Sequence, residues 1–569
     1  MKRPKRWKIC NPDEHQVEAM MAQYGLSRPT AMVLVNRGIS LEEVPDFINP
    51  RLSKLSDPFK LRDCLKAVER IWRAIHNGEK ILIFGDFDTD GITATVLLNW
   101  VLRENGAKVK VFLPLRMEDG YGLSVSALQK FEGDVDVVIT VDCGITSIEG
   151  AAWLREKGID LIITDHHEPG EVLPDAYAII NPKLEEYNDS YWYLSGVGVC
   201  FKLCHGFLKY GREKGLGGWR PELREGMDLV TLGTVADIVP LLGENRSLVR
   251  YGMKVLQTRH RPGIHALCEI CGLSEQLSTE DIAFRLAPRI NAAGRMGDAV
   301  EALELLQARS VIEAHELAAK LEQLNQKRQA QEELVYQAVK AYIEERELWR
   351  RNLIVAWDRD WHPGVLGIVA ARIAQEYNRP TIVLTGISGE ELSGSGRGVF
   401  NCNMIELLEP CRHLLLRYGG HPMAVGLALR EENIEQFIET VEAAIVDSGQ
   451  NLTHSIAVLE IEGVLSLAEL TEKWFREREL LQPFGHKNPM PCFMFRNVSA
   501  GKIAQAGTSS TRGVLFDEEN RRIEFIFFGT KPHEMPPQPW DISAIPDINS
   551  YGGVERPQLR ILDVRTSLG

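Results

Sequence analysis

The sequence lacks the features that mark secreted and membrane-spanning proteins. Its basic start, MKRPKRWKIC, runs straight into the polar stretch NPDEHQVEAM, so the apolar core of a secretory signal is missing. It has no run of about 18 apolar residues, which a membrane-spanning helix would need. The 10 cysteines are scattered over 569 residues without the dense spacing of small disulfide-bonded domains. We therefore expect a cytoplasmic protein that does not contact a membrane.

A complete zinc motif is also missing. Cys268 and Cys271 have CxxC spacing, but no second cysteine pair or histidine pair accompanies them. We interpret both as buried packing residues. With 44% hydrophobic and 25% charged residues, the composition is that of a globular protein. The length predicts about three or four domains.

Positive charge is in short supply, because 65 basic residues face 79 acidic ones and the net charge is −14. Taken alone, this balance argues against a nucleic-acid partner. However, residues 431–480 contain twelve acidic and three basic side chains and hold most of the excess. We interpret this segment as a solvated helical face and connector that an anionic substrate avoids. Basic loops elsewhere can then form a local positive track.

Residues 80–181 alternate apolar strands with helical stretches, which is typical of a parallel sheet covered by helices on both faces. The predicted strands are 80–85, 108–113, 135–141, 160–164 and 176–180, with helices over 92–105 and 147–158. Residues 311–348 contain no Gly or Pro and predict one long helix. A second α/β pattern covers 352–386, and short β-type runs from about residue 455 predict a small β-barrel.

Acidic side chains stand at the ends of three of these predicted strands. They are Asp86, Asp88 and Asp90 after strand 80–85, Asp142 after strand 135–141, and Asp165 with His166 and His167 after strand 160–164. Because ligands bind at the carboxyl ends of strands in an open parallel sheet, these side chains are expected to converge. Asp237 is a further acid among apolar residues, and it needs a partner if it is buried.

Crowded carboxylates repel one another unless a cation neutralises them, so the pattern predicts a metal site. Oxygen ligands alone suit Mg²⁺ or Ca²⁺, whereas added imidazole shifts the preference towards Mn²⁺ or another transition ion. The ligands suffice for two ions, which about 3.5–4 Å apart can assist hydrolysis at phosphorus. Each motif alone is more often a solvated loop, a helix cap or a surface histidine pair. Three acid-tipped strands in one sheet favour the metal site.

A glycine-rich turn in the second half offers a hold on an anionic polymer. GSGRG at 394–398 supplies Gly-flanked backbone amides together with Ser395 and Arg397. These groups suit a phosphate, although such a turn is also typical of a plain hairpin loop.

The chain resembles the DHH phosphoesterase superfamily and, within it, the bacterial single-stranded-DNA exonucleases. The motifs that carry the resemblance are GDFDTDG (85–91), VDCGI (141–145), TDHHEPG (164–170), GTVADIVPL (233–241), APRINAAGRMGDA (287–299), GSGRG (394–398) and GGHPMAVGLAL (419–429). The similarity spans nearly the whole chain in the family's domain order. It implies a multidomain α/β protein with a parallel-sheet DHH domain. The implied domains are an N-terminal cap region (1–70), the DHH domain (71–310), a long connecting helix (311–350), a second α/β, DHH-associated domain (351–450) and an OB-like β-barrel (451–569).

The resemblance also implies roles for individual residues. The ligands of two divalent ions, Mn²⁺ or Mg²⁺, would be Asp88, Asp90, Asp142, His166 and Asp237, with Asp142 between the ions. His167 would lie beside the scissile phosphate, and Asp86 and Asp165 would orient the ligands. DNA would be bound by Arg116, Arg289, Asn291, Arg295, Ser395, Arg397 and His421.

The implied activity is metal-dependent 5′→3′ degradation of single-stranded DNA to 5′-mononucleotides during recombination and repair. The protein would act as a monomer together with a single-strand-binding protein and a helicase. One alternative is a phosphodiesterase for short RNA or cyclic dinucleotides, although a small substrate needs neither the β-barrel nor the N-terminal region. Another is a DNA-binding scaffold without activity, which the intact set of metal ligands disfavours.

The chain departs from the family pattern at four positions, the last of them in a further family-like segment, PFGHKNPMPCF (483–493). Thr89 replaces a usual Ala, Gly398 a common Ser, Val425 a common Ala, and Lys487 a common Gly. None of these changes removes a candidate metal ligand.

Overall fold

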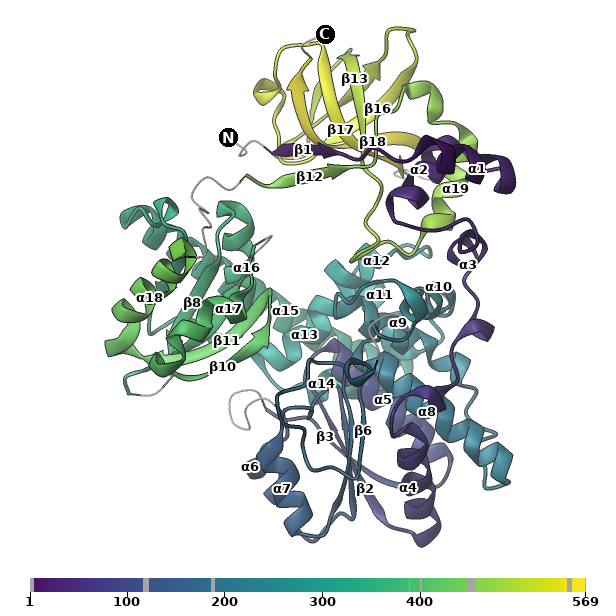
Figure 1. Cartoon of the computed structure of the whole chain (residues 1–569), viewed down its shortest axis with the longest axis vertical. Coiled ribbons are helices and arrows are strands. Elements are labelled where there is room, and N and C mark those ends of the chain that lie inside the picture. Colours follow the sequence, from purple (N-terminus) through teal and green to yellow (C-terminus); the bar gives the residue numbers. More distant parts are fainter. Residues whose placement is uncertain are drawn as a thin grey trace. The chain divides into compact units, whose positions relative to one another are not determined.

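The computed structural model describes seven stretches of the chain, which divide between two compact units (Figure 1). The described stretches are 5–115, 122–185, 190–387, 389–399, 402–447, 456–549 and 555–567. The larger unit is Leu55–Ser455, and the smaller unit joins Met1–Lys54 to Ile456–Gly569. Within the described stretches, no helix combines the length and the apolar character needed to cross a bilayer.

The first part of the larger unit is built on a five-stranded parallel sheet in the order β3-β2-β4-β5-β6. The strands are β2 (Lys80–Gly85), β3 (Lys108–Phe112), β4 (Val137–Val141), β5 (Asp160–Thr164) and β6 (Ala178–Ile180). All five residues of β4 are buried, as expected for a central strand covered on both faces. The predicted parallel α/β fold is confirmed, with strand ends shifted by at most two residues.

Helices cover both faces of this sheet. They are α4 (Cys64–Asn77), α5 (Thr89–Glu104), α6 (Val125–Gln129), α7 (Ile148–Glu156) and α8 (Gly196–Lys214). Helices α6 and α7 form one apolar core with Leu82, Phe84 and Leu161, while α4, α5 and α8 pack together on the opposite face. The carboxyl ends of the strands therefore remain the open edge at which polar side chains can gather.

A helical layer follows the sheet. It contains α9 (Met227–Ala236), α10 (Gly243–Gln257), α11 (Pro262–Ile270), α12 (Thr279–Asp281), the π-helical turn η5 (Ile282–Leu286), α13 (Ala287–Met296), α14 (Val300–Gln307) and α15 (Val311–Glu345). The 35-residue helix α15 agrees with the long helix predicted over 311–348. Ser310 begins it by accepting a hydrogen bond from the Glu313 N–H at 3.2 Å.

The second part of the larger unit is a mixed five-stranded sheet in the order β10-β11-β9-β8-β7. Its elements are β7 (Ile354–Trp357), α16 (Leu366–Tyr377), β8 (Thr381–Gly386), β9 (Glu391–Arg397), α17 (Met404–Leu408), β10 (Leu415–His421), β11 (Ala424–Arg430) and α18 (Ile434–Asp447). Only β7 and β8 run parallel, whereas the remaining neighbours are antiparallel. Helix α16 packs on β8 and β9, which places its first turn beside the glycine-rich end of β9.

The smaller unit contains the predicted C-terminal β-barrel. Its strands are β13 (Phe493–Ala500), β14 (Ala504–Ala506), β15 (Ser510–Phe516), β16 (Arg522–Phe527), β17 (Trp540–Asn549) and β18 (Arg556–Thr566). They follow the order β13-β17-β18-β16-β15-β14, and a further pairing of β13 with β15 closes the barrel. Aromatic side chains pack in its interior. The rings of Trp540 and Phe525 meet edge to face, with their centroids 6.3 Å apart.

The N-terminal region packs against this barrel in the same unit. Strand β1 (Arg6–Ile9) pairs in parallel with β12 (Val458–Ile461), and α1 (Glu14–Tyr24), α2 (Arg28–Asn36) and α3 (Val44–Ile48) accompany α19 (Glu472–Leu481). Met32 of α2 lies so close to Gly463 that a Cβ there would come within 2.2 Å of the methionine methyl. Residues 1–54 of the predicted cap region 1–70 thus belong to the smaller unit, whereas α4, which begins at Cys64, belongs to the larger one.

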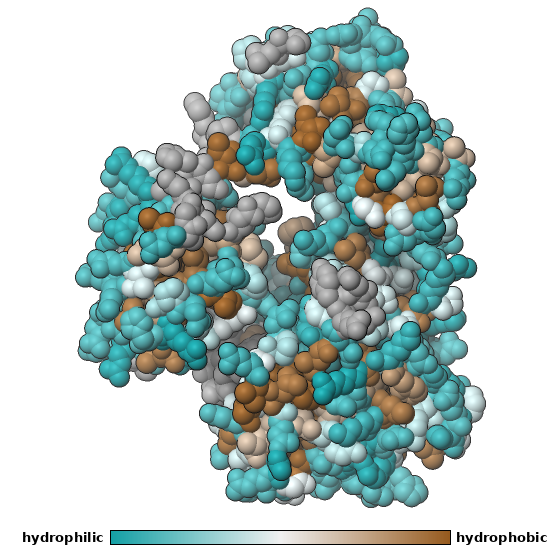
Figure 2. All heavy atoms as spheres, viewed as in Figure 1, coloured by the Kyte–Doolittle hydropathy of each residue, from teal (hydrophilic) through white to brown (hydrophobic). Residues whose placement is uncertain are grey.

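The acidic segment 431–480 contributes to both units. It is distributed over α18 in the larger unit and over β12 and α19 in the smaller one. Helix α18 buries Phe437 and Val441, so only part of its surface is a solvated face. On the face shown in Figure 2, hydrophilic residues cover most of the surface of both units.

The structure accounts for two local features of the sequence, the Cys268–Cys271 spacing and Lys487. Cys268 and Cys271 are buried free thiols, as predicted, and burial raises the pKa of Cys268 to about 11. Lys487 adopts a left-handed backbone with φ of 59° in a turn closed by Gly485 and Asn488. Such a backbone costs a residue with a Cβ roughly 1–2 kcal/mol, which explains why the family commonly has Gly there.

Candidate metal centre

The loop after β2 turns directly into helix α5 and thereby orients two carboxylates. Asp88 is the N-cap of α5, and its Oδ1 accepts hydrogen bonds from the N–H groups of Asp90 at 2.9 Å and Gly91 at 3.1 Å. Only glycine fits at position 91, because a Cβ there would lie 2.6 Å from the Asp86 carbonyl oxygen. Asp86, Asp88 and Asp90 are consequently held in one compact turn at the end of the strand.

Asp142 follows β4 in a left-handed backbone conformation with φ of 63°. Its N–H donates to the Thr164 carbonyl at 2.9 Å, which ties the turn to β5. The side chain is only 2% exposed. This uncommon backbone turns the carboxylate back over the strand ends instead of into solvent.

The next strand, β5, ends in Asp165, His166 and His167. The Oδ1 of Asp165 accepts from the backbone N–H groups of His166 and His167 and lies 2.7 Å from His167 Nδ1. Its Oδ2 accepts from the Ile145 N–H at 2.9 Å. Asp165 thus fixes the orientation of the His167 ring, as expected for a carboxylate behind a functional histidine.

Asp237 reaches the same place from the end of helix α9 and not from a strand. It is the C-cap of α9, and the next residue, Ile238, has a left-handed backbone with φ of 59°. For a β-branched residue this conformation is strained, and strain of this kind clusters at functional sites.

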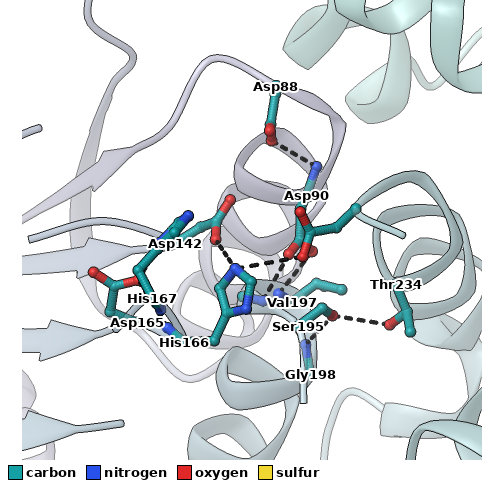
Figure 3. Close-up of polar contacts among 12 residues, drawn as sticks. Asp88, Asp90, Asp142, Asp165, His166, His167, Ser195, Val197, Gly198 and Thr234 are labelled. Carbon is teal, nitrogen blue, oxygen red and sulfur yellow. Dashed lines mark hydrogen bonds and ion pairs between the residues drawn. The ribbon is translucent and has the colours of Figure 1, made fainter. Parts of the chain in front are cut away.

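These side chains converge into one cluster (Figure 3). His166 Nε2 lies 3.1 Å from Asp142 Oδ1 and 3.4 Å from Asp237 Oδ2. Three sets of potential ligand atoms each lie within 4.8 Å of one another: Asp90 with His166 and Asp237, Asp86 with Asp88 and Asp142, and Asp142 with His166 and His167. Every acid and histidine predicted at the strand ends, together with Asp237, therefore belongs to the cluster or orients one of its members.

Three buried atoms in the cluster show that it is chemically incomplete. Asp142 Oδ1, His166 Nε2 and Asp237 Oδ2 are shielded from solvent and have no hydrogen-bond partner among the described residues. Such atoms are costly inside a protein unless another group satisfies them. Carboxylate oxygens and an imidazole nitrogen are ligands that Mn²⁺ and related divalent ions accept. The residues present fit a divalent cation.

The carboxyl groups in the cluster are difficult to ionise. Burial and the neighbouring Asp88 raise the pKa of Asp86 to about 8 and that of Asp90 to about 7. Burial, followed by repulsion from Asp90, raises the pKa of Asp142 and of Asp237 well above its usual value. Two or more adjacent carboxylates become stable anions together only when a positive charge lies among them.

The two histidines differ in charge. Burial and the positive His167 lower the pKa of His166 well below its usual value, so its ring is neutral, the form in which an imidazole can bind a metal ion. Burial alone would also lower the pKa of His167, but the charge and hydrogen bond of Asp165 raise it to about 9. Burial alone would raise the pKa of Asp165, but the charge of His167 and its hydrogen bond lower it to about 2. His167 and Asp165 consequently form an ion pair in which Asp165 is buried and His167 is partly exposed.

These pKa values predict how the metal-free protein responds to pH. Asp86, Asp90 and His167 have folded-state pKa values of about 8, 7 and 9, above those of the unfolded chain. Their stabilising protonation is fully present below the unfolded pKa and is lost as pH rises through the folded pKa. In chelator, the melting temperature should therefore fall progressively from about pH 4, the unfolded pKa of the two aspartates, to about pH 9, the folded pKa of His167. Saturating Mn²⁺ should weaken this fall, because metal ligands must be deprotonated. A melting temperature that rises across this window in chelator would contradict the proposed cluster.

The predicted DNA-binding residues of α13 are engaged within the larger unit. The Oδ1 of Asn291 accepts from both the N–H and the hydroxyl of Thr89, each at 2.8 Å. Thr89, the departure from the family pattern, therefore ties α13 to the acidic turn. Arg295 donates to the Gly364 carbonyl at 3.2 Å, whereas Arg289 Nε lies 2.5 Å from Glu322 Oε2. Arg116 lies outside the described residues.

The residues of the predicted phosphate cradle lie together at the end of β9. A Cβ at Gly367, in the first turn of α16, would lie 2.6 Å from the Arg397 guanidinium and 3.3 Å from the Ser395 hydroxyl. A helix N-terminus, a guanidinium and a hydroxyl thus share one place, a combination that suits an anion. His421, at the end of β10, stacks on His167 with ring centroids 5.5 Å apart and 17° between planes. This contact brings the second sheet to the acidic cluster.

Sequence patterns did not reveal the contact between the start of helix α8 and Asp90. The N–H groups of Gly196 and Val197 donate to the Asp90 carboxylate at 2.6 and 2.9 Å. The stretch SGVGV resembles an apolar helix start with a serine cap, so the helix was foreseeable but its partner was not.

Comparisons with known proteins agree with this arrangement. Residues 80–234 match the DHH family N-terminal domain, residues 350–447 match the DHHA1 domain, and residues 461–563 match the RecJ OB domain.

Individual relatives span most of the chain. The single-stranded-DNA-specific exonuclease RecJ of Bacillus subtilis (strain 168) is 34% identical over 99% of this chain and 71% of its own length. The protein of that name from Escherichia coli (strain K12) is 38% identical over 75% of this chain and 77% of its own length. The crystal structure of RecJ from Thermus thermophilus in complex with Mn²⁺ covers 99% of this chain, with 80% of that structure matched, at a TM-score of 0.84 and 28% identity. The chain therefore belongs to the RecJ family.

Proposed function

We propose that the protein is a metal-dependent 5′→3′ exonuclease that degrades single-stranded DNA to 5′-mononucleotides. The observation that carries this proposal is the convergence of buried atoms of Asp142, His166 and Asp237 that have no hydrogen-bond partner among the described residues, beside the strand ends of a RecJ-family sheet. Relatives named as single-stranded-DNA-specific exonucleases share most of the chain. We expect this protein to hydrolyse the phosphodiester bond nearest the 5′ end of the DNA strand.

The cluster would hold two divalent ions, Mn²⁺ or Mg²⁺. We assign Asp88, Asp90, Asp142, His166 and Asp237 as the ligands, with Asp142 shared between the two ions. Bound there, such ions activate water and stabilise the attacking and leaving oxygens. Asp86 adds a further carboxylate beside Asp88 and Asp142, which increases the negative potential that draws cations to the site.

His167 is the proposed contact with the scissile phosphate. As a cation held by Asp165, it donates hydrogen bonds to anionic oxygens and cannot rotate away. Asp165 is a positioning residue for this ring, since both of its oxygens are already occupied by the protein. Removing Asp165 should therefore misorient His167 without removing a metal ligand.

We propose that residues near both sheets of the larger unit bind the DNA. Ser395 and Arg397 would bind a phosphate at the start of α16, and His421 would bind one next to His167. Arg295 lies at the junction of α13 with the Gly364 loop. Arg289 is held by Glu322, so its contact with DNA requires that this ion pair open. Asn291 is a positioning residue for the Thr89 turn, and Arg116 remains a candidate.

The proposal also includes a domain division, a cellular location and protein partners. We propose the domain division 1–70, 71–310, 311–350, 351–450 and 451–569, with the catalytic chemistry in the second of these. The protein is proposed to act in the cytoplasm as a monomer, in recombination and repair, with a single-strand-binding protein and a helicase as partners. The RecJ OB domain match over residues 461–563 supports a single-stranded substrate over a cyclic dinucleotide.

The proposal is tested with two oligonucleotides of one sequence, labelled at either end and digested in Mn²⁺. A 5′ label should appear in mononucleotide at once, whereas a 3′ label should pass through progressively shorter strands. A blunt duplex of the same sequence serves as the control and should resist digestion. Initial release of the 3′ label would overturn the polarity. Faster turnover of a cyclic dinucleotide would favour the alternative phosphodiesterase. Strand binding without hydrolysis in any divalent ion would leave only a scaffold.

A further inference from the structure

The orientation of Asp90 is set from outside its own loop. Its Oδ2 accepts from the Gly196 N–H at 2.6 Å, and its Oδ1 accepts from the Val197 N–H at 2.9 Å (Figure 3). Both donors are in the first turn of α8, and the Asp90 side chain is buried. Any displacement of the α8 start therefore moves the Asp90 carboxylate with it.

A pair of hydroxyl groups joins the start of α8 to helix α9. Ser195 caps α8 by accepting from the Gly198 N–H at 3.2 Å, and its Oγ lies 3.0 Å from Thr234 Oγ1. Both residues are fully buried. Thr234 is in the last turn of α9, three residues before Asp237. The two hydroxyls consequently connect the support of one predicted metal ligand, Asp90, to the element that carries another, Asp237.

The two helices pack closely against the carboxylates around this connection. A Cβ at Gly196 would lie 2.2 Å from Asp142 Oδ1, and a Cβ at Gly233 would lie 2.7 Å from Asp90 Oδ1. Both helices thus approach the carboxylates with bare backbone. At such distances, a small shift of one helix against the other changes the spacing between carboxylates directly.

We propose that the Ser195–Thr234 pair is a positioning brace, which sets the distance between Asp90 and Asp237 and thereby the affinity of the metal position that both residues share with His166. This inference rests on the proposed function only in requiring that the cluster binds divalent ions. A purely structural hydrogen bond would affect the stability of the fold, whereas a brace of this kind affects one metal position more than the other. Groups that orient metal ligands from behind typically change metal affinity by about 10–100-fold.

The chain offers a matched pair of substitutions on one helix. Thr234→Val removes the bracing hydroxyl while keeping the side-chain shape. Thr231→Val makes the same change one turn earlier in α9, at a buried hydroxyl that has no hydrogen-bond partner among the described residues. Thr234→Ser retains the hydroxyl and loses only a methyl group. Ser195→Ala removes the other half of the brace.

The test is a titration of the full-length protein with Mn²⁺ in the absence of DNA, in which electron paramagnetic resonance measures free Mn²⁺. The wild type should bind two ions. Thr234→Val should weaken one of them by about tenfold and leave the other within about twofold. Thr231→Val and Thr234→Ser should bind as the wild type does. Ser195→Ala should weaken the same ion, and the double variant should be no weaker than the weaker single variant, because both act through one contact.

Melting temperatures in chelator establish that each variant is folded, and Ser195→Ala keeps the inference testable if Thr234→Val does not fold. Unchanged Mn²⁺ binding by Thr234→Val and by Ser195→Ala would overturn the brace. Equal losses in Thr234→Val and Thr231→Val, or equal losses at both metal positions, would also overturn it. If the wild type itself bound no Mn²⁺, the proposed metal centre would fail first, a result distinct from failure of the brace.

Discussion

Asp142→Asn should reduce exonuclease activity by about three to four orders of magnitude, as expected when a central catalytic group is lost. Asp142 supplies atoms to two of the three sets of potential ligands. If both ions share Asp142, as proposed, its loss should affect both metal positions. A carboxamide keeps the shape of the side chain but lacks the negative charge that holds a divalent ion. Initial rates on a labelled single strand in saturating Mn²⁺ measure the loss.

The same substitution should make the metal-free protein more stable. Burial and the nearby acids raise the pKa of Asp142, because its negative form is unfavourable in this environment. Asn relieves that repulsion, and it also tolerates the left-handed backbone at φ of 63°. Relief of about 1 kcal/mol would raise the melting temperature in chelator by roughly 2–4 °C. Opposite signs for activity and stability distinguish a metal ligand from a residue that merely packs.

Asp447→Asn provides the matched control, because this exposed acid at the end of α18 belongs to no ligand set among the described residues. It should change neither activity nor melting temperature appreciably. Retention of more than about a tenth of the activity by Asp142→Asn would contradict a shared metal ligand, given the expected effect size.

The strand-end acids were predictable because local sequence patterns determine them. Alternating apolar strands and helices reveal a parallel sheet, and chain order alone places Asp88, Asp142 and His166 at one edge of it. Asp237 was recognised as an acid among apolar residues, although its position at a helix end needed the structure. The convergence of the strand-end acids thus follows from one-dimensional periodicity together with one topological rule, whereas the assignment of individual metal ligands rests on the resemblance to the family.

Contacts between distant segments were not predictable, since no local pattern encodes them. Strands β1 and β12 are paired although more than four hundred residues separate them in the sequence. This pairing puts the N-terminal region in the same unit as the barrel. The Glu322 partner of Arg289 is likewise on another helix, so the sequence did not indicate that this predicted DNA-binding arginine lies in an ion pair. Surface charge counted along the sequence does not show which arginines are already neutralised.

His421→Ala should lower kcat/KM on single-stranded DNA by about 10²–10³-fold, the loss expected when a group that positions substrate or donates a hydrogen bond at the reacting phosphate is removed. The ring stacks on His167, which is a cation at neutral pH. Loss of surrounding water and the charge of His167 lower the pKa of His421, so its imidazole is neutral. A neutral imidazole offers one N–H donor, which suits a phosphate oxygen beside the positively charged ring.

The decisive comparison is between DNA hydrolysis and metal binding. His421 belongs to none of the ligand sets found among the described residues, so His421→Ala should bind Mn²⁺ as tightly as the wild type. His413→Ala, at an exposed histidine in the same part of the larger unit, should leave both properties unchanged. A parallel loss of Mn²⁺ affinity would make His421 a metal ligand, and an unchanged kcat/KM would remove it from the substrate site. Normal metal binding with slow hydrolysis would instead show that the second sheet contributes directly to holding the phosphate, because the acidic cluster alone would then bind metal without catalysing efficiently.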